Sequence, residues 1–390
     1  MSRLPGFVAR HVVFPRRPLR VTMLSVVQAS FHADRLRRPP EQLLEAWPTL
    51  RETAAAVARA GCAVTVVHAA RQTARIERDG VSYRFQRVGF FGARGSRWLA
   101  GMGGIISAVR DAAPDVLHVQ SLRSPLQAAL LARALPGIPM LAQDHADRPA
   151  HGVRRPLQRW GYRRLAGVAF TARTMAQPFF DTRILRPDVP VFEVIEGSTF
   201  FTPGEAAEIQ GDPCVVWVGR LDENKDPLTV LAAVELAAAE LPNLQLWCLY
   251  TDAPLEETVR RRVESSPKLA GRVHLRGALP RDKVEAHLRR ADLFVLGSHH
   301  EGSGYALIEA LACGATPVVS DIPPFRKITD GGSLGGLFPP GDAGAMARLL
   351  VAWTGKTDRR KVRRHFEQAL SYDAIGRQLQ EAYQALVKQP

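Results

Sequence analysis

Short apolar runs recur along the chain, separated by longer stretches in which apolar positions return with a helical period. Such runs, bounded by turn residues, are typical of strands buried on both faces of a parallel sheet. They lie at 20–27, 63–67, 115–119, 140–142, 167–171, 191–195, 214–218, 244–250, 273–276, 293–296 and 316–320. Helices are predicted at 48–60, 102–109, 124–135, 281–290, 305–312, 343–354 and 362–386. This alternation predicts an α/β fold with parallel sheets covered by helices, and Asp79-Gly80 predicts a hairpin turn before 81–88.

The length of the chain predicts two domains, because 390 residues can form two full hydrophobic cores. We expect a basic N-terminal arm at 1–19, a first domain at 20–198 and a second domain at 199–367, with a linker of turn residues at 196–204. The chain has no apolar run long enough to span a membrane, and its first twenty residues lack the continuous apolar core of a signal peptide. We therefore expect a cytoplasmic protein whose membrane contact, if any, is peripheral.

Cysteine usage supports the same compartment. No Cys-x-x-Cys pair occurs, and three of the four cysteines lie in apolar, strand-like runs; the four are Cys62, Cys214, Cys248 and Cys313. This pattern favours buried free thiols in a reducing environment over a disulfide framework or a zinc site.

Positive charge is concentrated in the first half of the chain. Residues 1–200 contain 29 arginines, no lysine and 14 acidic residues, a net charge of +15, whereas residues 201–390 have a net charge of −1. The excess indicates either an anionic partner or an arginine-rich surface that only contacts water. Within it, residues 154–165 (RRPLQRWGYRRL) place aromatic and apolar side chains among five arginines, namely Arg154, Arg155, Arg159, Arg163 and Arg164. Contact with an anionic membrane and a solvated helix are both open, and nucleic acid is the least favoured partner.

Candidate chemistry is concentrated between Leu293 and Ser320, where a strand, a loop, a helix and a second strand are predicted. Glu301 and Glu309 lie eight positions apart, and glycines between them mark the helix N-terminus. Glycine allows a ligand to approach the backbone, and free N–H groups at a helix N-terminus suit a phosphate. The pattern fits a ligand with hydroxyls at both ends and phosphates in the middle, which is the shape of a nucleotide sugar.

The string Glu-Gly-x-Gly-x4-Glu-Ala-x-Ala-x-Gly-x-Pro-Val-Val, beginning at Glu301, resembles the Glu-x7-Glu motif of the family-4 retaining glycosyltransferases of the GT-B fold. The resemblance implies two Rossmann-like domains whose parallel sheets face each other across a cleft. The second domain would bind the sugar donor and the first the acceptor. It also implies that the C-terminal helix, at 368–390, crosses back onto the first domain.

The same resemblance implies roles for particular residues of the second domain. Residues 218–226 are similar to the family pattern Val-Gly-Arg-x4-Lys-Gly, with Asp226 in place of the final glycine. Arg220 and Lys225 would contact the diphosphate, because fixed cations stabilise the charge that grows on a leaving phosphate. Glu301 would bind sugar hydroxyls, Glu309 the ribose and Leu279 the base. The remaining donor contacts would come from Gly219, Gly302, Ser303, Gly304 and Tyr305.

The first domain matches the family less closely. His145, in the loop 143–147, lies where relatives place a histidine that faces the donor sugar, although it could instead cap the loop beside Asp144. The loop after the first strand, 28–34, lacks the usual Gly-Gly pair, so the insert 31–45 could serve the acceptor. His32 in that insert is either an acceptor contact or an ordinary surface histidine. In the linker, Glu196 replaces an asparagine.

Several motifs are absent from the sequence. It has no Gly-x-Gly-x-x-Gly after the first strand, no Gly-x4-Gly-Lys-Ser/Thr loop and no Asp-x-Asp pair. The adjacent His299 and His300 fit ordinary loop residues better than a metal site. We therefore expect a metal-independent glycosyltransferase that uses a nucleoside diphosphate sugar as co-substrate and no other cofactor, with a glycan or lipid-linked acceptor. A GT-B epimerase or phosphorylase and a non-catalytic sugar-binding protein remain alternatives.

Overall fold

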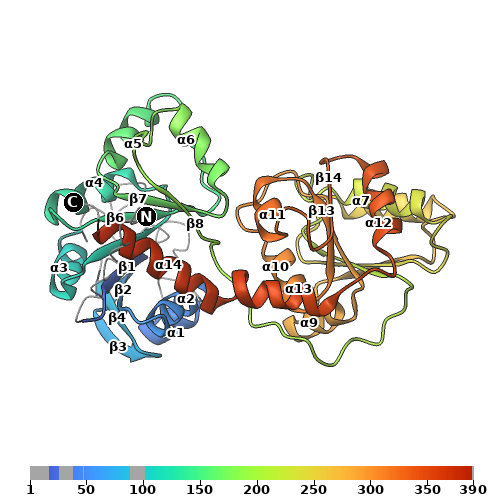
Figure 1. The fold of residues 1–390 in the computed structure, drawn as a ribbon, viewed down its shortest axis with the longest axis horizontal. Coiled ribbons are helices and arrows are strands. Elements are labelled where there is room, and N and C mark those ends of the chain that lie inside the picture. The colour runs from blue at the N-terminus through green and yellow to red at the C-terminus, as the bar shows by residue number, and fades with distance from the viewer. Residues whose placement is uncertain (1–16, 26–37, 47, 88–101, 389–390) are drawn as a thin grey trace, which may run out of the picture.

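The computed structural model describes residues 17–25, 38–46, 48–87 and 102–388, and it contains two α/β domains side by side (Figure 1). The predicted arm at 1–19 lies mostly outside these residues, as do the loop 28–34 and His32. Within the described residues, eight strands of the first domain form one sheet in the order β3-β4-β2-β1-β5-β6-β7-β8. They are β1 (Arg20–Ser25), β2 (Ala63–Ala70), β3 (Ala74–Arg78), β4 (Val81–Arg87), β5 (Val116–Gln120), β6 (Met140–Gln143), β7 (Gly167–Phe170) and β8 (Val191–Glu193).

Every neighbouring pair in this sheet is parallel except β3 and β4, which form the hairpin predicted at Asp79-Gly80. Both turn residues have positive φ, at 52° and 75°, as a tight hairpin turn requires. The helical segments of this domain are α1 (Pro40–Ala46), α2 (Pro48–Arg59), α3 (Met102–Ala112), α4 (Pro125–Ala134), α5 (Arg154–Tyr162), η4 (Arg173–Ala176) and α6 (Gln177–Asp181).

The second domain contains a six-stranded parallel sheet in the order β11-β10-β9-β12-β13-β14. Its strands are β9 (Cys214–Gly219), β10 (Gln245–Tyr250), β11 (Val273–Gly277), β12 (Leu293–Leu296), β13 (Thr316–Ser320) and β14 (Gly336–Phe338). The covering helices are α7 (Pro227–Ala237), α8 (Glu256–Glu264), α9 (Arg281–Arg290), α10 (Tyr305–Ala312), α11 (Pro323–Ile328) and α12 (Ala343–Trp353). The sequence patterns did not predict α7, α8, α11 or β14.

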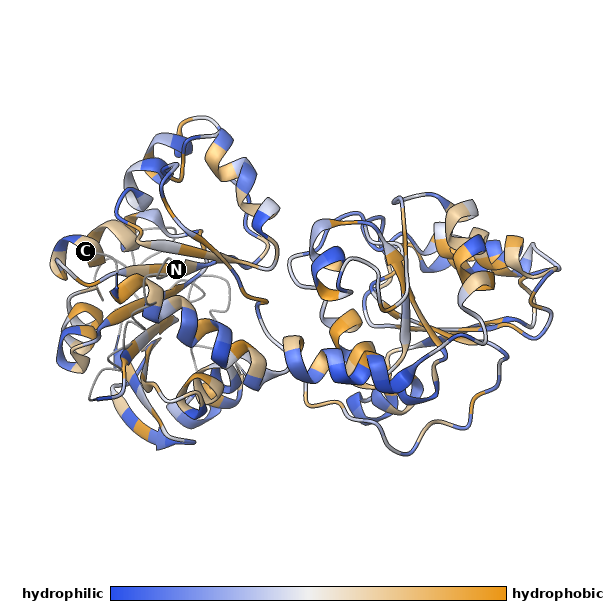
Figure 2. Cartoon of the chain, viewed as in Figure 1, coloured by the Kyte–Doolittle hydropathy of each residue, from blue (hydrophilic) through white to orange (hydrophobic). Residues whose placement is uncertain are grey.

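The C-terminal segment differs from the single helix predicted at 362–386. It consists of α13 (Arg359–His365), one π-helical turn η5 (Phe366–Leu370) and α14 (Tyr372–Val387). The helix is interrupted because Ser371 has an extended backbone, with ψ of 159°, and its hydroxyl accepts a hydrogen bond from the N–H of Ala374. Figure 1 shows α14 crossing from the second domain onto the first, and Figure 2 shows that the preceding α13 is strongly hydrophilic.

Helix α14 packs tightly against α2, because Gly376 has no side chain at the contact: a Cβ there would lie 2.4 Å from the carbonyl oxygen of Ala56. Through this contact the apolar core of the second domain continues onto one face of the first sheet, while a separate cluster fills the other face. All four cysteines are free and buried, as predicted. Among the described residues, no helix combines the length and the apolar character needed to cross a membrane.

Candidate functional site

A cavity of about 310 Å³ lies beyond the carboxyl ends of β9 and β10, beside the start of α10. Strand order reverses at β9, which has β10 on one side and β12 on the other. In open α/β sheets such a switch point is where ligands bind. The cavity is lined by Val218, Gly219, Arg220, Lys225, Leu249, Tyr250, Thr251, Ala278, Leu279, Val284 and Ala306. Four predicted donor-binding residues, Gly219, Arg220, Lys225 and Leu279, thus line one hollow.

Two cations of this cavity are held by carboxylates. The ammonium of Lys225 forms an ion pair with Glu301, and each of these side chains is less than 15% exposed. The guanidinium of Arg220 is about half exposed and lies 2.9 Å from an oxygen of Asp222. The other Asp222 oxygen accepts the backbone N–H of Lys225 at 2.9 Å, which fixes the turn after β9. Lys225 and Glu301, 76 positions apart in the sequence, therefore meet at one edge of the sheet.

Asp226 explains one departure from the family pattern. It has a left-handed backbone, with φ of 44°, which glycine adopts without strain and aspartate tolerates. Its carboxylate accepts the N–H and the hydroxyl of Thr229 at 3.1 and 2.7 Å and so caps α7. It also lies 3.2 Å from Nε2 of His299. Among the described residues, no group of three or more His, Cys, Asp or Glu side chains is placed to hold a metal ion.

The loop 301–304 brings the backbone of the second domain close to the first. Gly304, the residue before α10, has φ of 73°, and a Cβ there would lie 2.6 Å from the ring of Phe325. A Cβ on Gly302 would lie 2.8 Å from that of Ala146 in the first domain. Ser303 is buried, whereas Tyr305 is about a third exposed. Both glycines are required for close approach, and Ala306, in the first turn of α10, lines the cavity, so the N-terminus of the helix lies beside it.

Glu309 lies about one helical turn beyond Ala306, the α10 residue that lines the cavity, and therefore on the same face of α10. Its carboxylate is mostly buried and lies 3.4 Å from the guanidinium of Arg281. Burial raises the pKa of Glu309, and the charge of Arg281 offsets only part of that rise. The cavity lining itself includes neither glutamate, so both carboxylates adjoin the hollow instead of forming its wall.

On the first domain, His145 has protein partners on both ring nitrogens. Its Nδ1 lies 2.8 Å from Oε1 of Glu196, and its Nε2 lies 2.9 Å from Oε1 of Gln120. Burial lowers the pKa of His145, but the carboxylate of Glu196 and the nearby acids outweigh that effect, so the pKa lies above its ordinary value. Neither ring nitrogen of His145 can therefore bind a donor sugar without exchanging a partner.

The neighbouring residue Asp144 was noted in the sequence only as a neighbour of His145 in the loop. It is 6% exposed and accepts the N–H of Asp147 at 2.8 Å. Burial raises the pKa of Asp144 to about 7, with further help from the charge of Asp147. Asp147 in turn accepts the N–H of Leu122 at 2.6 Å and pairs with Arg123. The loop is thus fixed by its own acids, and His145 is not its cap.

Sequence reasoning missed the partners of His145. Glu196 attracted notice only as a replacement for asparagine, and Gln120 not at all. The ends of β5 and β6 point to the same sheet edge, which would have placed Gln120 near the His145 loop. Nothing in the local sequence could bring the linker carboxylate there.

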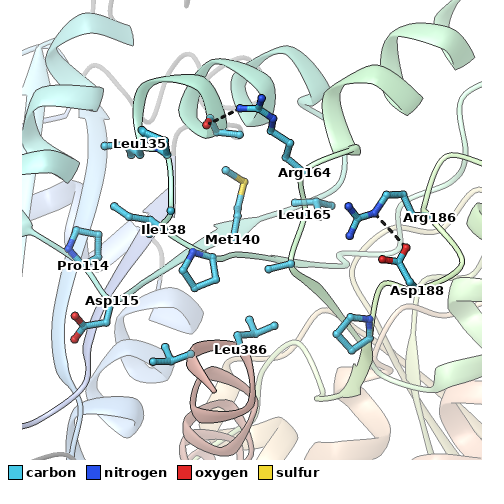
Figure 3. Close-up of a pocket in the computed structure, with 17 residues that line it drawn as sticks. Pro114, Asp115, Leu135, Ile138, Met140, Arg164, Leu165, Arg186, Asp188 and Leu386 are labelled. Carbon is cyan, nitrogen blue, oxygen red and sulfur yellow. Dashed lines mark hydrogen bonds and ion pairs between the residues drawn. The ribbon is translucent and has the colours of Figure 1, made fainter. Parts of the chain in front are cut away.

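A larger hollow, about 860 Å³, lies in the first domain, at the amino-terminal ends of β6, β7 and β8 (Figure 3). The His145 loop follows the carboxyl end of β6, at the other edge of the same sheet. The charged groups of the hollow are matched within the chain: Arg186 pairs with Asp188 at 3.3 Å, and Asp115 accepts from Arg17 and Arg20 at 3.0 Å. Arg164 donates to the carbonyl of Ala132 at 3.4 Å. This hollow is larger than the cavity at β9. The smaller cavity is nevertheless the better candidate site, because it lies at a switch point of its sheet beside two cations and a helix N-terminus.

Comparison with known proteins gives matches over most of the chain. The family model described as "Glycosyl transferases group 1" matches residues 212–354, and "Glycosyl transferase 4-like domain" matches 45–191. A GDP-mannose:cellobiosyl-diphosphopolyprenol alpha-mannosyltransferase of Xanthomonas oryzae pv. oryzae is 26% identical over 62% of this chain and 64% of that protein. A phosphatidyl-myo-inositol mannosyltransferase of Mycolicibacterium smegmatis is 27% identical over 61% of each chain. The matches span less than two thirds of these relatives.

Solved structures agree in fold. A glycosyltransferase from Rickettsia africae ESF-5 superposes with a TM-score of 0.70 at 13% identity, over 96% of this chain and all of that one. Sucrose-phosphate synthase from Thermosynechococcus elongatus gives a TM-score of 0.63 at 17% identity, over 94% and 99%. These likenesses confirm the predicted two-domain arrangement of parallel sheets. The superpositions show the GT-B fold, and the two family models, which together match residues 45–191 and 212–354, show that the chain belongs to the family-4 glycosyltransferases.

Proposed function

We propose that this chain transfers a sugar from a nucleoside diphosphate sugar to a hydroxyl of a glycan or lipid-linked acceptor, with retention of anomeric configuration and without a metal ion. The observation that supports this most is the cavity at the β9 switch point, where Arg220 and Lys225 adjoin the N-terminus of α10. These groups suit a diphosphate by charge and by hydrogen bonding. The apolar wall around Leu279 suits a base.

In the proposed reaction the bond between the anomeric carbon and the phosphate oxygen breaks. A bond forms between that carbon and the acceptor oxygen, and the acceptor proton passes to the departing diphosphate. Arg220 and Lys225 would stabilise the charge that develops on this diphosphate. Lys225 is held by Glu301 in the structure, so donor binding would place the sugar hydroxyls on Glu301 and the phosphate beside Lys225. Glu309 would accept a hydrogen bond from the ribose.

The donor we propose is GDP-mannose, because the curated relatives above are named mannosyltransferases and one of them is named for GDP-mannose. Their named acceptors, a diphosphopolyprenol-linked sugar and a phosphatidylinositol, lead us to propose a lipid-linked acceptor. The test is a thermal-shift series with GDP, UDP, ADP and the corresponding sugars, followed by an assay of slow donor hydrolysis. We expect GDP and GDP-mannose to raise Tm most and GDP-mannose to be hydrolysed. Binding without any turnover would favour a non-catalytic sugar-binding protein instead.

We also propose that α5 lies against an anionic membrane surface at the inner face of the membrane. The helix exposes apolar side chains beside its arginines: Val153 is 94%, Leu157 45% and Trp160 42% exposed. Helix α5 continues through Gly161. The glycine allows α5 to pack on α4, because a Cβ at this position would lie 2.3 Å from the carbonyl oxygen of Pro125. Apolar groups flanked by arginines on one exposed helix suit a lipid headgroup layer.

Sedimentation with vesicles tests this surface. We expect the protein to pellet with phosphatidylglycerol vesicles and not with phosphatidylcholine, and salt to weaken the binding. Changing Arg154, Arg155, Arg163 and Arg164 to Gln should abolish it. The matched control changes four exposed arginines of the second domain, Arg260, Arg261, Arg360 and Arg364, and should retain binding. Equal binding by both variants would show that α5 is a solvated helix.

A further inference from the structure

Glu196 lies at the boundary between the two domains, three residues after the end of β8 and at the start of the segment that leads to β9. Its side chain is about a fifth exposed, and both carboxylate oxygens are engaged. One oxygen lies 2.8 Å from Nδ1 of His145 in the first domain. The other accepts the hydroxyl of Ser303, in the second domain, at 3.2 Å. A single carboxylate therefore holds one loop from each domain.

The backbone reinforces this arrangement. The N–H of Glu196 donates to the hydroxyl oxygen of Ser303 at 3.3 Å, and Oγ1 of Thr171 lies 3.4 Å from the same oxygen. Beside these bonds Gly302 lies so close to Ala146 that a side chain would not fit without a shift. The two loops thus meet through hydrogen bonds at Ser303 and through direct packing at Gly302, next to the Glu301–Lys225 pair.

We propose that Glu196 is a positioning residue that ties the His145 loop of the first domain to the Ser303 loop of the second, and so sets the shape of the sugar-binding part of the donor site. This inference rests on the proposed function, since it assigns Glu196 to the site at which the donor sugar would lie. The asparagine that the family pattern places here is uncharged, so an ion pair with His145 requires the glutamate of this chain.

The hydrogen bonds of His145 show what the carboxylate contributes. The two ring nitrogens of His145 face acceptors, the carboxylate of Glu196 and the side-chain oxygen Oε1 of Gln120, and this arrangement favours the imidazolium, in which both nitrogens donate. Behind Gln120 the network continues through Nε2 of His118, 3.3 Å away, to the hydroxyl of Tyr383 on α14, 2.7 Å from Nδ1 of His118. Burial lowers the pKa of His118 to about 3, so that ring is neutral.

The charged and titratable groups around His145 come from each element packed against it. They are Glu196 from the linker, Asp144 and Asp147 from its own loop, and His118 from β5. The carboxylates favour the imidazolium, and Glu196 is both the nearest and the one bonded to the ring. Replacing Glu196 by an isosteric amide removes that charge and allows Nδ1 to become an acceptor, so the ring becomes neutral with its hydrogen on Nε2.

The test is the titration of His145 by NMR, with the ring nitrogens labelled and the signal assigned from its loss in His145→Gln. In the unaltered protein we expect a midpoint above that of a free histidine. In Glu196→Gln the midpoint should move to lower pH, and the nitrogen shifts should report a neutral ring protonated on Nε2. The matched control is Glu193→Gln on β8, which removes an ion pair with Lys327, 2.9 Å away, and should leave the midpoint unchanged.

A kinetic comparison tests the link to the donor. Glu196→Gln should raise KM for GDP-mannose about tenfold, as the loss of roughly 1.4 kcal/mol of binding would do, while the Kd for GDP stays unchanged. Ser303→Ala should raise KM in the same way without moving the His145 midpoint. An unchanged midpoint in Glu196→Gln, or unchanged KM in both variants, would overturn the inference. The titration needs no turnover, so the two proposals can fail separately. If the protein binds no nucleotide sugar, the proposed function is refuted, and the NMR titration still tests whether Glu196 sets the protonation of His145.

Discussion

The two domains hold the charged groups of the candidate site differently. On the second domain, Arg220 is half exposed beside its aspartate, and Lys225 has Glu301 as its ion-pair partner at the mouth of a cavity. On the first domain, His145 has both ring nitrogens bonded within the protein. The first arrangement can exchange its partners for a ligand. In the second arrangement the side chain is held by bonds within the protein. This difference is what we expect if the second domain binds the donor and the first domain positions it.

This contrast has a physical basis. Arg220 is half exposed and therefore partly hydrated, so a diphosphate can replace Asp222 at little cost, whereas Lys225 is mostly buried and pairs with the carboxylate of Glu301. His145 is mostly enclosed and has an acceptor at each ring nitrogen, so turning its ring to a neutral sugar hydroxyl would cost more than it gains, because the carboxylate of Glu196 would be left without its partner. The comparison therefore predicts large catalytic effects from changes on the second domain. Changes on the first should affect stability, pH dependence and KM.

The largest effect is expected at Lys225. Lys225→Ala should lower kcat/KM for donor hydrolysis by about 10²–10³, or about 3–4 kcal/mol, because a fixed cation is lost where leaving-group charge develops. The measurement is release of GDP from GDP-mannose. Lys356→Ala, at an exposed lysine of the same domain, serves as the control and should match the unaltered protein. Equal rates for both variants would mean that Lys225 does not touch the diphosphate.

Asp144 should give the first domain a pH-dependent stability. Its pKa is raised from about 3.8 to about 7, so the folded state binds the proton more tightly than the unfolded state does. This stabilisation is complete below about pH 4 and is lost as the pH rises towards 7, a change on the order of 2–4 kcal/mol.

Chemical unfolding at several pH values measures that loss. Asp144→Asn should flatten the curve between pH 4 and 7. Above that range the raised pKa of His145 should still make stability fall with pH, because a proton bound more tightly in the folded state is then released. If the variant and the unaltered protein show the same slope, the buried acid is not protonated in the folded state.

A substitution at Gly302 should change the contact between the two loops without changing the stability of either domain. Gly302→Ala places a methyl group 2.8 Å from Ala146, and the resulting overlap costs about 1–3 kcal/mol unless the loops separate. We expect separation, seen as a higher KM for the nucleotide sugar with little change in the thermal midpoint. Gly271→Ala, where no atom lies within 4 Å of the new group, is the control for steric overlap, although its positive φ adds some strain.

The smallest effect is expected at Glu309. If its carboxylate accepts a ribose hydroxyl, Glu309→Gln should weaken GDP binding by about 1–2 kcal/mol, roughly tenfold. Mannose 1-phosphate has no ribose and should bind equally well to both proteins. Calorimetry with the two ligands provides the comparison, and equal weakening of both would place Glu309 away from the ribose.

Elements with a strong pattern were predictable, and those with a weak pattern were not. The apolar runs at 214–218 and 293–296 match β9 and β12, because buried parallel strands have little choice of composition. Helix α7 is apolar on nearly every face, so no helical period marks it, and β14 has only three residues. The helical period predicted one helix at 362–386, and it did not register the N-cap at Ser371, where the structure divides that segment.

The donor side of the site could be predicted because its residues lie in contiguous motifs, and strand order places those motifs at one sheet edge. The sequence by itself determined the α/β class, the two domains' parallel strands, the buried thiols and the proximity of Arg220 and Lys225 to the start of α10. Only the tertiary structure decided that Glu196 would bond His145 and Ser303, and that Asp144 would be buried. These contacts join residues tens to more than a hundred positions apart across a domain boundary, and their energies depend on burial and geometry that exist only after both domains have folded.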